Sequence, residues 1–514
     1  GGKDFFRDRK QLSFFLVFLL VLFLAVFFSV WDVLNKEFGS GEISLGPISA
    51  DLEVGGVTTE HFDLAVDKSN SNIYLVYQEN TTKVYNKKIF NGNSWSAPEP
   101  ITGINSRDKN PKIAVDTLGN IHLVFQREGN TKIAYMRYTP NGWTTPVDIS
   151  QSDTNIDGVN DGSITVPQIA VDSRNNVHIA SFLIPPDPAY PGSSTPFYYI
   201  SKARYMFSKY NGAGWDSFIT EDKEYKGSSS TRSNGAHPAI TVDKNDNLHM
   251  VYMGSPWAIL VHQVRSLSGT WSSPQIIQCT SKECPVASTS ALYQGDGVGD
   301  FMDIEVDNNG VIYVSGQWTR GYDSSSGYAE NYVSIWSTNG QGSSSSGQGN
   351  WKRWRSYRYY WDPMSDIEVD SAGNVYMVWS VWTLGDPALG DPWKTWTSTI
   401  ADPSPLCTSG ENLVDRKAHY MIYDSSKSQW LIPSNDPCPP TTSDVLPNLG
   451  SRHRTANYRS YPRLAVTSSG VYAFWIDRDN RLQLYMTPLS RSQATISPTC
   501  SDVDGDGYGQ GCLS

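Results

Sequence analysis

Apolar and polar residues alternate along short stretches of this chain, and the same alternation occurs seven times. In the stretch Pro111 to Phe125, two alternating runs flank the segment Asp116-Thr-Leu-Gly119-Asn120. Alternation with a period of two is typical of a β-strand that buries one face, and an Asp/Gly/Asn-rich break between two such runs is typical of a tight turn. Each copy is therefore predicted to be a β-hairpin. The copies start at Phe62, Pro111, Pro167, Pro238, Met302, Ser365 and Pro462.

The spacing of the copies predicts more than a hairpin in each repeat. Most copies lie about 50 to 70 residues apart, a period that belongs to repeated antiparallel sheets. After each hairpin comes a third apolar run, then Gly-x-Trp or a close variant, then a fourth short run such as Val147 to Ser150. Four antiparallel strands make one propeller blade. We therefore predict an all-β fold, a seven-bladed β-propeller of four-stranded antiparallel blades over residues 61–490. Because such a ring must be sealed, a strand from before His61 is expected to complete the last blade.

A long apolar run predicts one N-terminal hydrophobic α-helix, assigned to residues 1–35 and followed by a Gly-rich linker at 36–60. From Leu12 to Trp31 the run is interrupted only by serines, so as a helix it would cross about 30 Å of hydrocarbon. A membrane anchor or signal peptide is one interpretation. The other interpretation starts from the first residue, which is Gly1 and not Met. If this residue results from processing, a signal peptidase would have removed the apolar run, whereas a prepilin-type peptidase cuts before the run and leaves it attached. In this respect the segment resembles the assembly helix of type IV pilins, which implies self-association in a filament.

Charge and cysteine content narrow the partners and the compartment. The net charge is −11, with 52 acidic and 41 basic residues, which argues against a nucleic-acid partner. The cysteines lack the double CxxC spacing of a zinc site, so disulfides in an oxidising compartment are predicted. We therefore expect the chain to be extracellular or at the cell surface, attached through the N-terminal helix. The cysteines form three local couples: Cys279 with Cys284, Cys407 with Cys438, and Cys500 with Cys512.

Two segments have the spacing of calcium loops, in which oxygen ligands at alternate positions wrap around a hard cation. Neither has the closing Glu of an EF-hand. The C-terminal segment, residues 491–514, resembles thrombospondin type 3 repeats, which are Asp-rich and tied by disulfides, and the resemblance implies calcium. An acidic end without metal is the alternative there, and a turn-rich loop is the alternative for the second segment. The predicted ligands are Asp502, Asp504, Asp506 and Tyr508 in the first, and Asp153, Asn155 and Asp157 in the second.

One slot of the repeat differs from copy to copy. It is the residue just before the Ile or Leu of the first strand, and if that strand is the innermost, the slot residues ring one level of a central channel. Three carboxylates and two cations there would orient a polar ligand or a cation. A solvated channel wall is the alternative. Around the seven copies the slot holds Asp63, Lys112, Gln168, Ala239, Asp303, Asp366 and Arg463.

Other chemically suggestive residues are explained by the repeat. His122, His178 and His249 occupy a strand slot that other copies fill with Tyr, so they are interpreted as strand residues rather than metal ligands. The hairpin aspartates are turn formers. An aromatic-rich segment is the best candidate for sugar binding, because flat rings stack on sugar faces and arginines bind acidic groups; packing in a blade core is the alternative. Its proposed residues are Trp351, Trp354, Arg355 and Arg358.

The repeats resemble sialidase-like (BNR or Asp-box-type) propellers in a degenerate form. The turn Ser-x-Asp-x-Gly-x-x-Trp of that family keeps its Gly and Trp here, at Trp95, Trp143, Trp215 and Trp271, but not its Asp. The resemblance covers most of the chain. It implies a propeller, and in active members three arginines that bind a substrate carboxylate, a Tyr with a Glu partner, and an Asp acid/base. The sequence does not select among Arg320, Arg355, Arg358, Arg459 and Arg463.

Two functional hypotheses follow, because fold alone does not fix function. The first is a non-enzymatic cell-surface protein, in which the propeller is displayed on the hydrophobic helix as a structural or adhesive subunit and polymerises into a pilus-like filament. The second is a membrane-anchored sialidase-like glycoside hydrolase or glycan-binding lectin. A surface glycan is a partner under either hypothesis.

Overall fold

The computed structural model describes residues 44–45, 52–128, 132–151, 163–184, 202–224, 236–254, 259–277, 297–298, 302–323, 328–338, 352–359, 365–380, 418–426, 429–433, 462–477 and 482–489. The elements in these residues are all β-strands, which confirms the predicted all-β class for them. No helix in this part of the chain is long and apolar enough to cross a membrane. The predicted helix 1–35, the six cysteines and all predicted calcium ligands lie outside the described residues.

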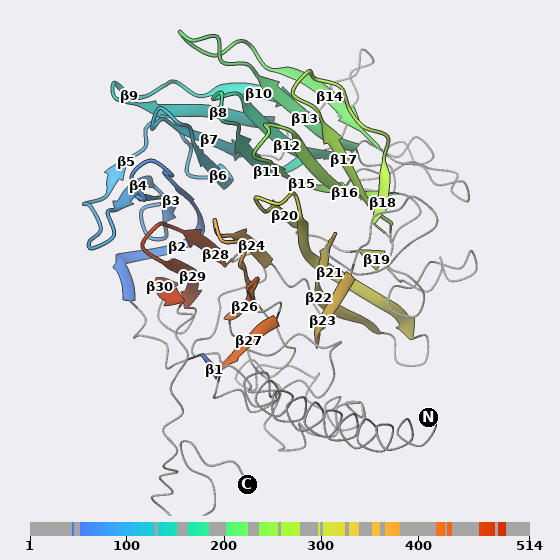
Figure 1. The fold of residues 1–514 in the computed structure, drawn as a ribbon. Helices are drawn as coiled ribbons and strands as arrows, with labels where there is room; N and C mark the ends of the chain where they lie inside the picture. Colours follow the sequence, from blue (N-terminus) through green and yellow to red (C-terminus); the bar gives the residue numbers. More distant parts are fainter. Residues whose placement is uncertain are drawn as a thin grey trace, which may run out of the picture. The chain divides into compact units, whose positions relative to one another are not determined.

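Four sheets carry four antiparallel strands in chain order, the order of a propeller blade (Figure 1). The first contains β6 (Lys109–Val115), β7 (Ile121–Gln126), β8 (Lys132–Thr139) and β10 (Val147–Gln151), and the short β9 (Gly142–Trp143) also pairs with β8. The second contains β11 (Ser163–Val171), β12 (Val177–Ile184), β13 (Lys202–Ser208) and β14 (Ile219–Lys223). The third contains β15 (Ala236–Val242), β16 (Leu248–Gly254), β17 (Ile259–Arg265) and β18 (Gln275–Ile277). The fourth contains β24 (Ser365–Val369), β25 (Val375–Ser380), β26 (Ala418–Asp424) and β27 (Gln429–Pro433).

The two remaining sheets have five and seven strands. One contains β20 (Asp303–Val306), β21 (Ile312–Asp323), β22 (Tyr328–Ser337) and β23 (Lys352–Tyr359), and β19 (Gly297–Val298) also pairs with β21. The other runs in the order β28 (Arg463–Val466), β29 (Val471–Asp477), β30 (Gln483–Leu489), β2 (Leu52–Val66), β3 (Ile73–Glu79), β4 (Tyr85–Phe90) and β5 (Glu99–Pro100). The remaining strand, β1 (Ser44–Leu45), is short.

The long strand β2 joins the first repeat to the last. Its early residues pair with β30, with Leu52 opposite Met486, and its later residues pair with β3, with Phe62 opposite Tyr77. The expected strand from before His61 that completes the last repeat is thereby confirmed. β2 begins inside the segment assigned to a linker at 36–60, so that boundary was placed too late, because a Gly-Gly break within β2 was interpreted as linker sequence.

The inner strands enclose a central channel. β2, β6, β11, β15, β20, β24 and β28 contact one another in this order, and β28 contacts β2. Each is the strand that begins a sequence repeat. The arrangement is therefore propeller-like, and the number of blades stays a prediction.

The hairpin after the inner strand is organised by an aspartate in six repeats and by Thr467 in the last. At Asp116, the backbone N–H donates to Asn120 O (3.0 Å) and Gly119 N–H donates to Asp116 O (3.1 Å), while the carboxylate accepts from Leu118 and Asn120 N–H. This is a turn closed by a residue with positive φ, and Gly119 adopts it at φ 79° without steric cost. Asn175 and Asp246 take the same position at φ 67° and 61°.

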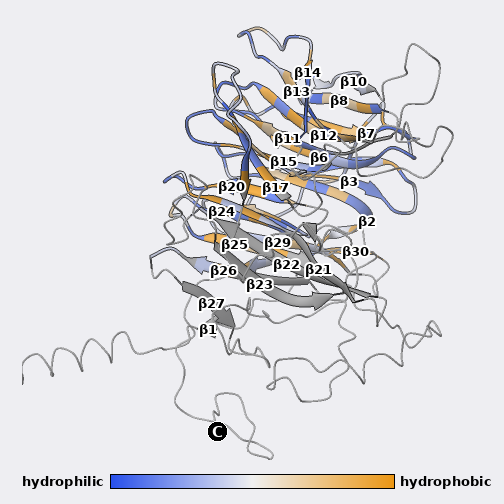
Figure 2. Cartoon of the chain, turned by 90° about the vertical axis from the view of Figure 1, so that its right-hand side faces the viewer, coloured by the Kyte–Doolittle hydropathy of each residue, from blue (hydrophilic) through white to orange (hydrophobic). Residues whose placement is uncertain are grey.

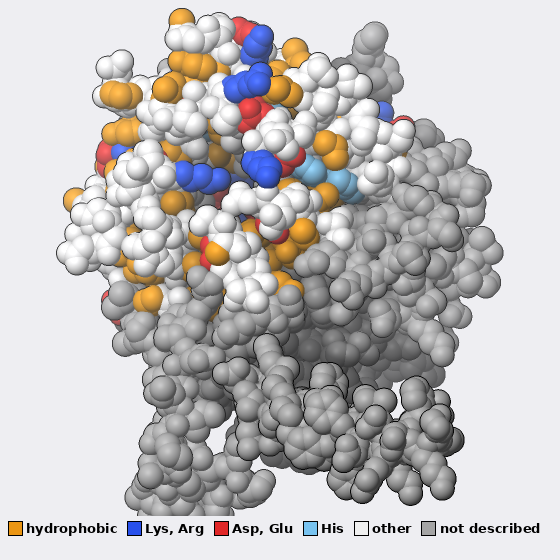
Figure 3. Space-filling model, in the orientation of Figure 1, with side chains coloured by type: hydrophobic (Ala, Val, Ile, Leu, Met, Phe, Trp, Pro, Cys, Tyr) orange, Lys and Arg blue, Asp and Glu red, His pale blue; other side chains and the backbone are white. Residues whose placement is uncertain are grey.

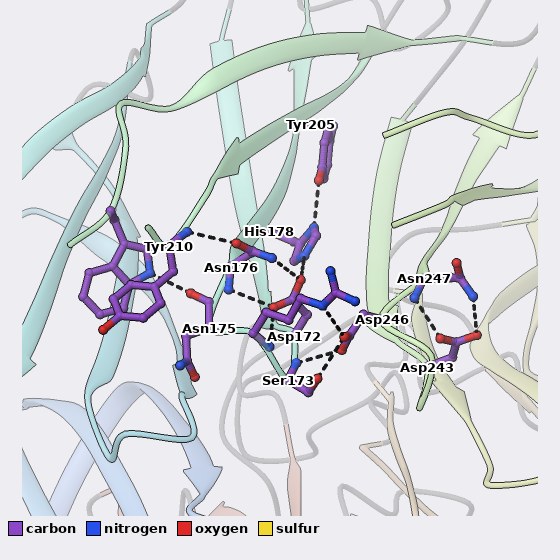
Figure 4. Close-up of polar contacts among 12 residues, drawn as sticks. Asp172, Ser173, Asn175, Asn176, His178, Tyr205, Tyr210, Asp243, Asp246 and Asn247 are labelled. Atoms are coloured by element: carbon purple, nitrogen blue, oxygen red, sulfur yellow. Dashed lines mark hydrogen bonds and ion pairs between the residues drawn. The ribbon is translucent and has the colours of Figure 1, made fainter. Parts of the chain in front are cut away.

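The side chains at that position also connect neighbouring hairpins. Asn175 Oδ1 accepts from Thr117 N–H at 2.9 Å, and the Asp246 carboxylate accepts from both N–H and O–H of Ser173 at 2.9 Å (Figure 4). Asn and Asp tolerate positive φ and also supply a hydrogen-bond acceptor, which explains why they replace Gly where the turn bonds to the neighbouring hairpin.

Hydrophobic side chains pack between successive sheets. One core cluster joins Val76 and Tyr85 of one sheet to Ile113 and Leu123 of the next, and Figure 2 shows hydrophobic colour concentrated along the strands and hydrophilic colour in the connecting turns. The repeated tryptophans belong to these contacts: the ring of Trp215 lies 5.1 Å from that of His122 in the preceding repeat. The Gly-x-Trp signature is therefore a packing element between repeats.

Candidate functional site

A cavity of about 130 Å³ lies among the inner strands, with room for several water molecules. All five charged slot residues predicted from the sequence line it: Asp63, Lys112, Asp303, Asp366 and Arg463. Gln168 lines it as well, whereas Ala239 is fully buried in a hydrophobic cluster. The structure thus brings together residues that are up to 400 positions apart in the sequence.

The slot aspartates bond the backbone of the next inner strand around the ring. Asp63 Oδ2 accepts from Ile113 N–H at 2.9 Å, Asp303 Oδ2 from Ile367 N–H at 3.0 Å, and Asp366 Oδ2 from Leu464 N–H at 2.7 Å. A carboxylate that accepts a backbone N–H in the protein interior is strongly held. Each aspartate therefore has a structural role in addition to facing the cavity.

Arg463 joins three repeats at once. Its Nε donates to Asp63 Oδ1 at 2.7 Å and its Nη1 to Asp366 Oδ1 at 2.9 Å, and all three side chains are buried. Lys112 approaches Asp63 Oδ1 from the other side at 3.4 Å. Burial alone would lower the pKa of Arg463, but the charges of Asp366, Asp63 and Asp303 raise it further above its usual value. Both cations of the cavity therefore face carboxylates of the same level.

A second level of the channel lies two residues further along each inner strand. Four repeats have alanine there, at Ala65, Ala114, Ala170 and Ala465, whereas the others have Thr241, Glu305 and Glu368. Thr241 Oγ1 donates to Glu305 Oε2 at 3.2 Å. Within the described residues Glu368 makes no hydrogen bond or ion pair. Both glutamates line the cavity.

Burial raises the pKa values of Asp303, Glu305, Asp366 and Glu368. Burial in the protein interior raises the pKa of Glu305 to about 8 and that of Asp366 to about 7. The pKa of Glu368 is raised well above its usual value, first by burial and then by the charge of Glu305. Glu305 and Glu368 are half-buried, and both line the cavity. Burial also lowers the pKa of Lys112.

On the outer surface, acidic and basic side chains pair with one another. Figure 3 shows basic and acidic side chains close together on the described surface. The ion pairs of Asp148 with Arg127 (3.1 Å) and with Lys132 (3.0 Å) are of this kind. In the cavity, carboxyl groups outnumber cations.

His122 and His178 form scaffold networks and do not line the cavity, whereas His237 does line it. His122 contacts the Tyr135 hydroxyl at 2.7 Å and Asp116 at 3.1 Å, and His178 contacts Tyr205 at 2.7 Å and Asp172 at 3.3 Å (Figure 4 shows the second). Each network ties a hairpin turn to the strands beside it. Burial lowers the pKa of both histidines, which keeps them neutral.

The aromatic-rich segment lies apart from the cavity strands. Trp354, Arg355 and Arg358 are in β23, which is separated from β20 by β21 and β22, and Trp351 lies outside the described residues. Of the five arginines considered for a sialidase-like triad, Arg463 is the one whose side chain is described, and it is bound to aspartates. The predicted sugar-binding role of this segment stays a prediction.

Glu305 and Glu368 were missed by the sequence reasoning. The signal that would have found them was present: in the slot two residues after the variable one, four alanines stand against two glutamates. Aligning the repeats one position at a time, instead of at one slot, exposes this difference.

No protein-family model matches the sequence, and neither does any curated protein. Among solved structures, a polysaccharide lyase described as a PL25 ulvan lyase is 10% identical, with TM-score 0.44, covering 88% of this chain and 96% of that chain. The alpha-L-arabinanase of Penicillium chrysogenum is 12% identical, with TM-score 0.38, covering 76% and 95%. The N10 neuraminidase-like protein of an influenza virus from the little yellow-shouldered bat is 10% identical, with TM-score 0.37, covering 65% and 95%. Likenesses this weak carry no argument about function.

Proposed function

We propose that this chain is a binding protein, a seven-bladed propeller displayed outside the cell, whose central cavity holds a small polar ligand. The observation that carries the proposal is the cavity itself, where five carboxyl groups, one amine and one guanidinium face a space of about 130 Å³. The fold does not require all of these groups, because four repeats have alanine where Glu305 and Glu368 stand. A non-enzymatic, adhesive role fits a site of this kind.

The placement of the protein outside the cell rests on its sequence. The apolar run from Leu12 to Trp31, the three cysteine couples and the calcium-like loops support attachment at a cell surface. Polymerisation of the apolar segment into a filament is the wider form of this proposal, and bound calcium and the three disulfides belong to it.

The binding role is tested by screening small sugars, amines and acids for a rise in melting temperature. At least one is expected to stabilise the protein, because a ligand that binds the folded state alone raises its stability. Glu368→Gln should then weaken binding by about tenfold or more, as expected for the loss of a hydrogen bond to a charged group. The matched control is Glu128→Gln, a half-exposed carboxylate that pairs with Arg107 on the surface. A screen without any stabilising compound, or one whose hits ignore Glu368→Gln, would contradict the proposal.

A second candidate function is glycoside hydrolysis, favoured by the proton held at Glu305. With a pKa raised to about 8 by burial, this carboxyl is protonated at neutral pH and can act as a general acid. Neighbouring carboxyls with separated pKa values are the arrangement glycosidases use. Fluorogenic glycosides, sialosides included, should then be cleaved at a rate that falls as pH rises through 8. Glu305→Gln should slow the reaction by about a hundredfold. Absence of turnover at any pH excludes this candidate for the substrates used.

A further inference from the structure

The charged side chains of the cavity lie at two levels. Those of the first level are paired with one another, whereas those of the second level have few partners among the described residues. In the first level, Asp63 and Asp366 are bound by Arg463 and by backbone N–H groups, and Lys112 adds a third contact to Asp63. These groups hold the ring closed. An anionic ligand would find both cations facing carboxylates, so the first level does not favour one.

Among the described residues, no cation forms an ion pair with the carboxyl groups of the second level. Glu305 receives one hydrogen bond, from Thr241, and the charge of the exposed Lys68 at a hairpin turn acts on both glutamates. The charged and titratable groups that act on this pair are Asp303, Asp366 and Lys68.

The third and fourth repeats supply an apolar part of the same wall. Ile169 of β11, Ile240 of β15 and Pro238 line the cavity, as does Met302, which precedes β20. Leu64, Ile113 and Leu464 of the first, second and seventh repeats line the cavity as well, so apolar residues are distributed around it.

We infer that the ligand carries a protonated amine that lies between Glu305 and Glu368. This inference rests on the proposed binding function and specifies its ligand class. The amine supplies the positive charge that the second level lacks, and its N–H groups donate to both carboxylates. Because the pKa of Glu305 is raised to about 8, this carboxyl holds a proton at neutral pH, and amine binding releases that proton to solvent.

The test compares two probes of equal shape, trans-4-aminocyclohexanol and trans-cyclohexane-1,4-diol, by isothermal titration calorimetry with the full chain. The alkyl amine of the first is protonated at neutral pH. We expect it to bind about tenfold more tightly than the diol, and the binding heat to vary with the ionisation heat of the buffer, which measures proton release. Glu305→Gln and Glu368→Gln should each abolish the preference, whereas Glu128→Gln should retain it. Melting curves of each variant verify that it is folded.

The outcomes separate this inference from the binding function. If the diol binds as tightly as the amine, or if the preference survives both substitutions, the cavity binds ligands but the amine inference is wrong. If neither probe binds and the wider screen also finds nothing, the binding function fails and the inference fails with it. Amine binding without proton release would also overturn the inference, because it would place the amine elsewhere.

Discussion

Replacing Arg463 with methionine is expected to lower the free energy of unfolding by about 3 to 5 kcal/mol, the usual cost of removing one partner from a buried charge network. Methionine fills a similar volume but leaves Asp63 and Asp366 without the guanidinium that donates to them at 2.7 and 2.9 Å. These bonds join the last repeat to the first repeat and to the sixth repeat. Their loss therefore weakens the contact that closes the ring. Urea unfolding followed by tryptophan fluorescence measures the change.

Two comparisons make the Arg463 result specific. Arg107→Met removes a surface ion pair with Glu128, both side chains being at least half exposed, and should leave the free energy of unfolding almost unchanged. Adding Asp63→Asn and Asp366→Asn to Arg463→Met should recover part of the loss, because neutral amides are cheaper to bury unpaired than carboxylates. An Arg463→Met protein as stable as the parent would show that the charge network does not hold the ring.

Replacing His262 with tyrosine is expected to reduce the acid sensitivity of the protein. Between neutral pH and pH 5, the free energy of unfolding should fall by about 2 kcal/mol less in the variant than in the parent. Burial, followed by the charge of His249, lowers the pKa of His262 to about 3. The unfolded chain titrates near the ordinary value of 6.5, so below that pH it takes up a proton that the folded state refuses. Stability is therefore present above pH 6.5 and is lost as pH falls toward 3. Tyrosine does not titrate in this range.

The repeat supplies both the design and its control. In the second and third repeats the position of His262 is held by Tyr135 and Tyr205, whose hydroxyls lie 2.7 Å from His122 and His178. In the fourth repeat His262 itself lies 3.1 Å from His249, so tyrosine should fit there. Tyr135→His should have the opposite effect and make the second repeat acid-sensitive. Thermal melts between pH 4 and 7 measure both, and identical pH profiles for parent and His262→Tyr would refute the linkage.

The position of the candidate site was predictable because the fold repeats. Once seven copies are aligned, a slot that holds Asp63 in one and Arg463 in another cannot be explained by the scaffold alone, and an inner-strand assignment places all copies on one ring. The roles of these residues were not predictable. The aspartates were expected to face a ligand, yet each also binds a backbone N–H of the neighbouring strand, for example Asp303 with Ile367.

The sequence by itself determined the strands, the hairpin turns and the ring level of the variable slot, because alternation, turn residues such as Asp116 and Gly119, and periodicity are local properties. Tertiary structure alone decided what depends on distance across the ring. It joined Arg463 to Asp63 across 400 positions, extended β2 back to Leu52 to pair with the last repeat, and set Glu305 and Glu368 beside one another in the channel. The pKa values of these carboxyl groups depend on burial and on the distance to other charges, and both are set by the fold and not by sequence position.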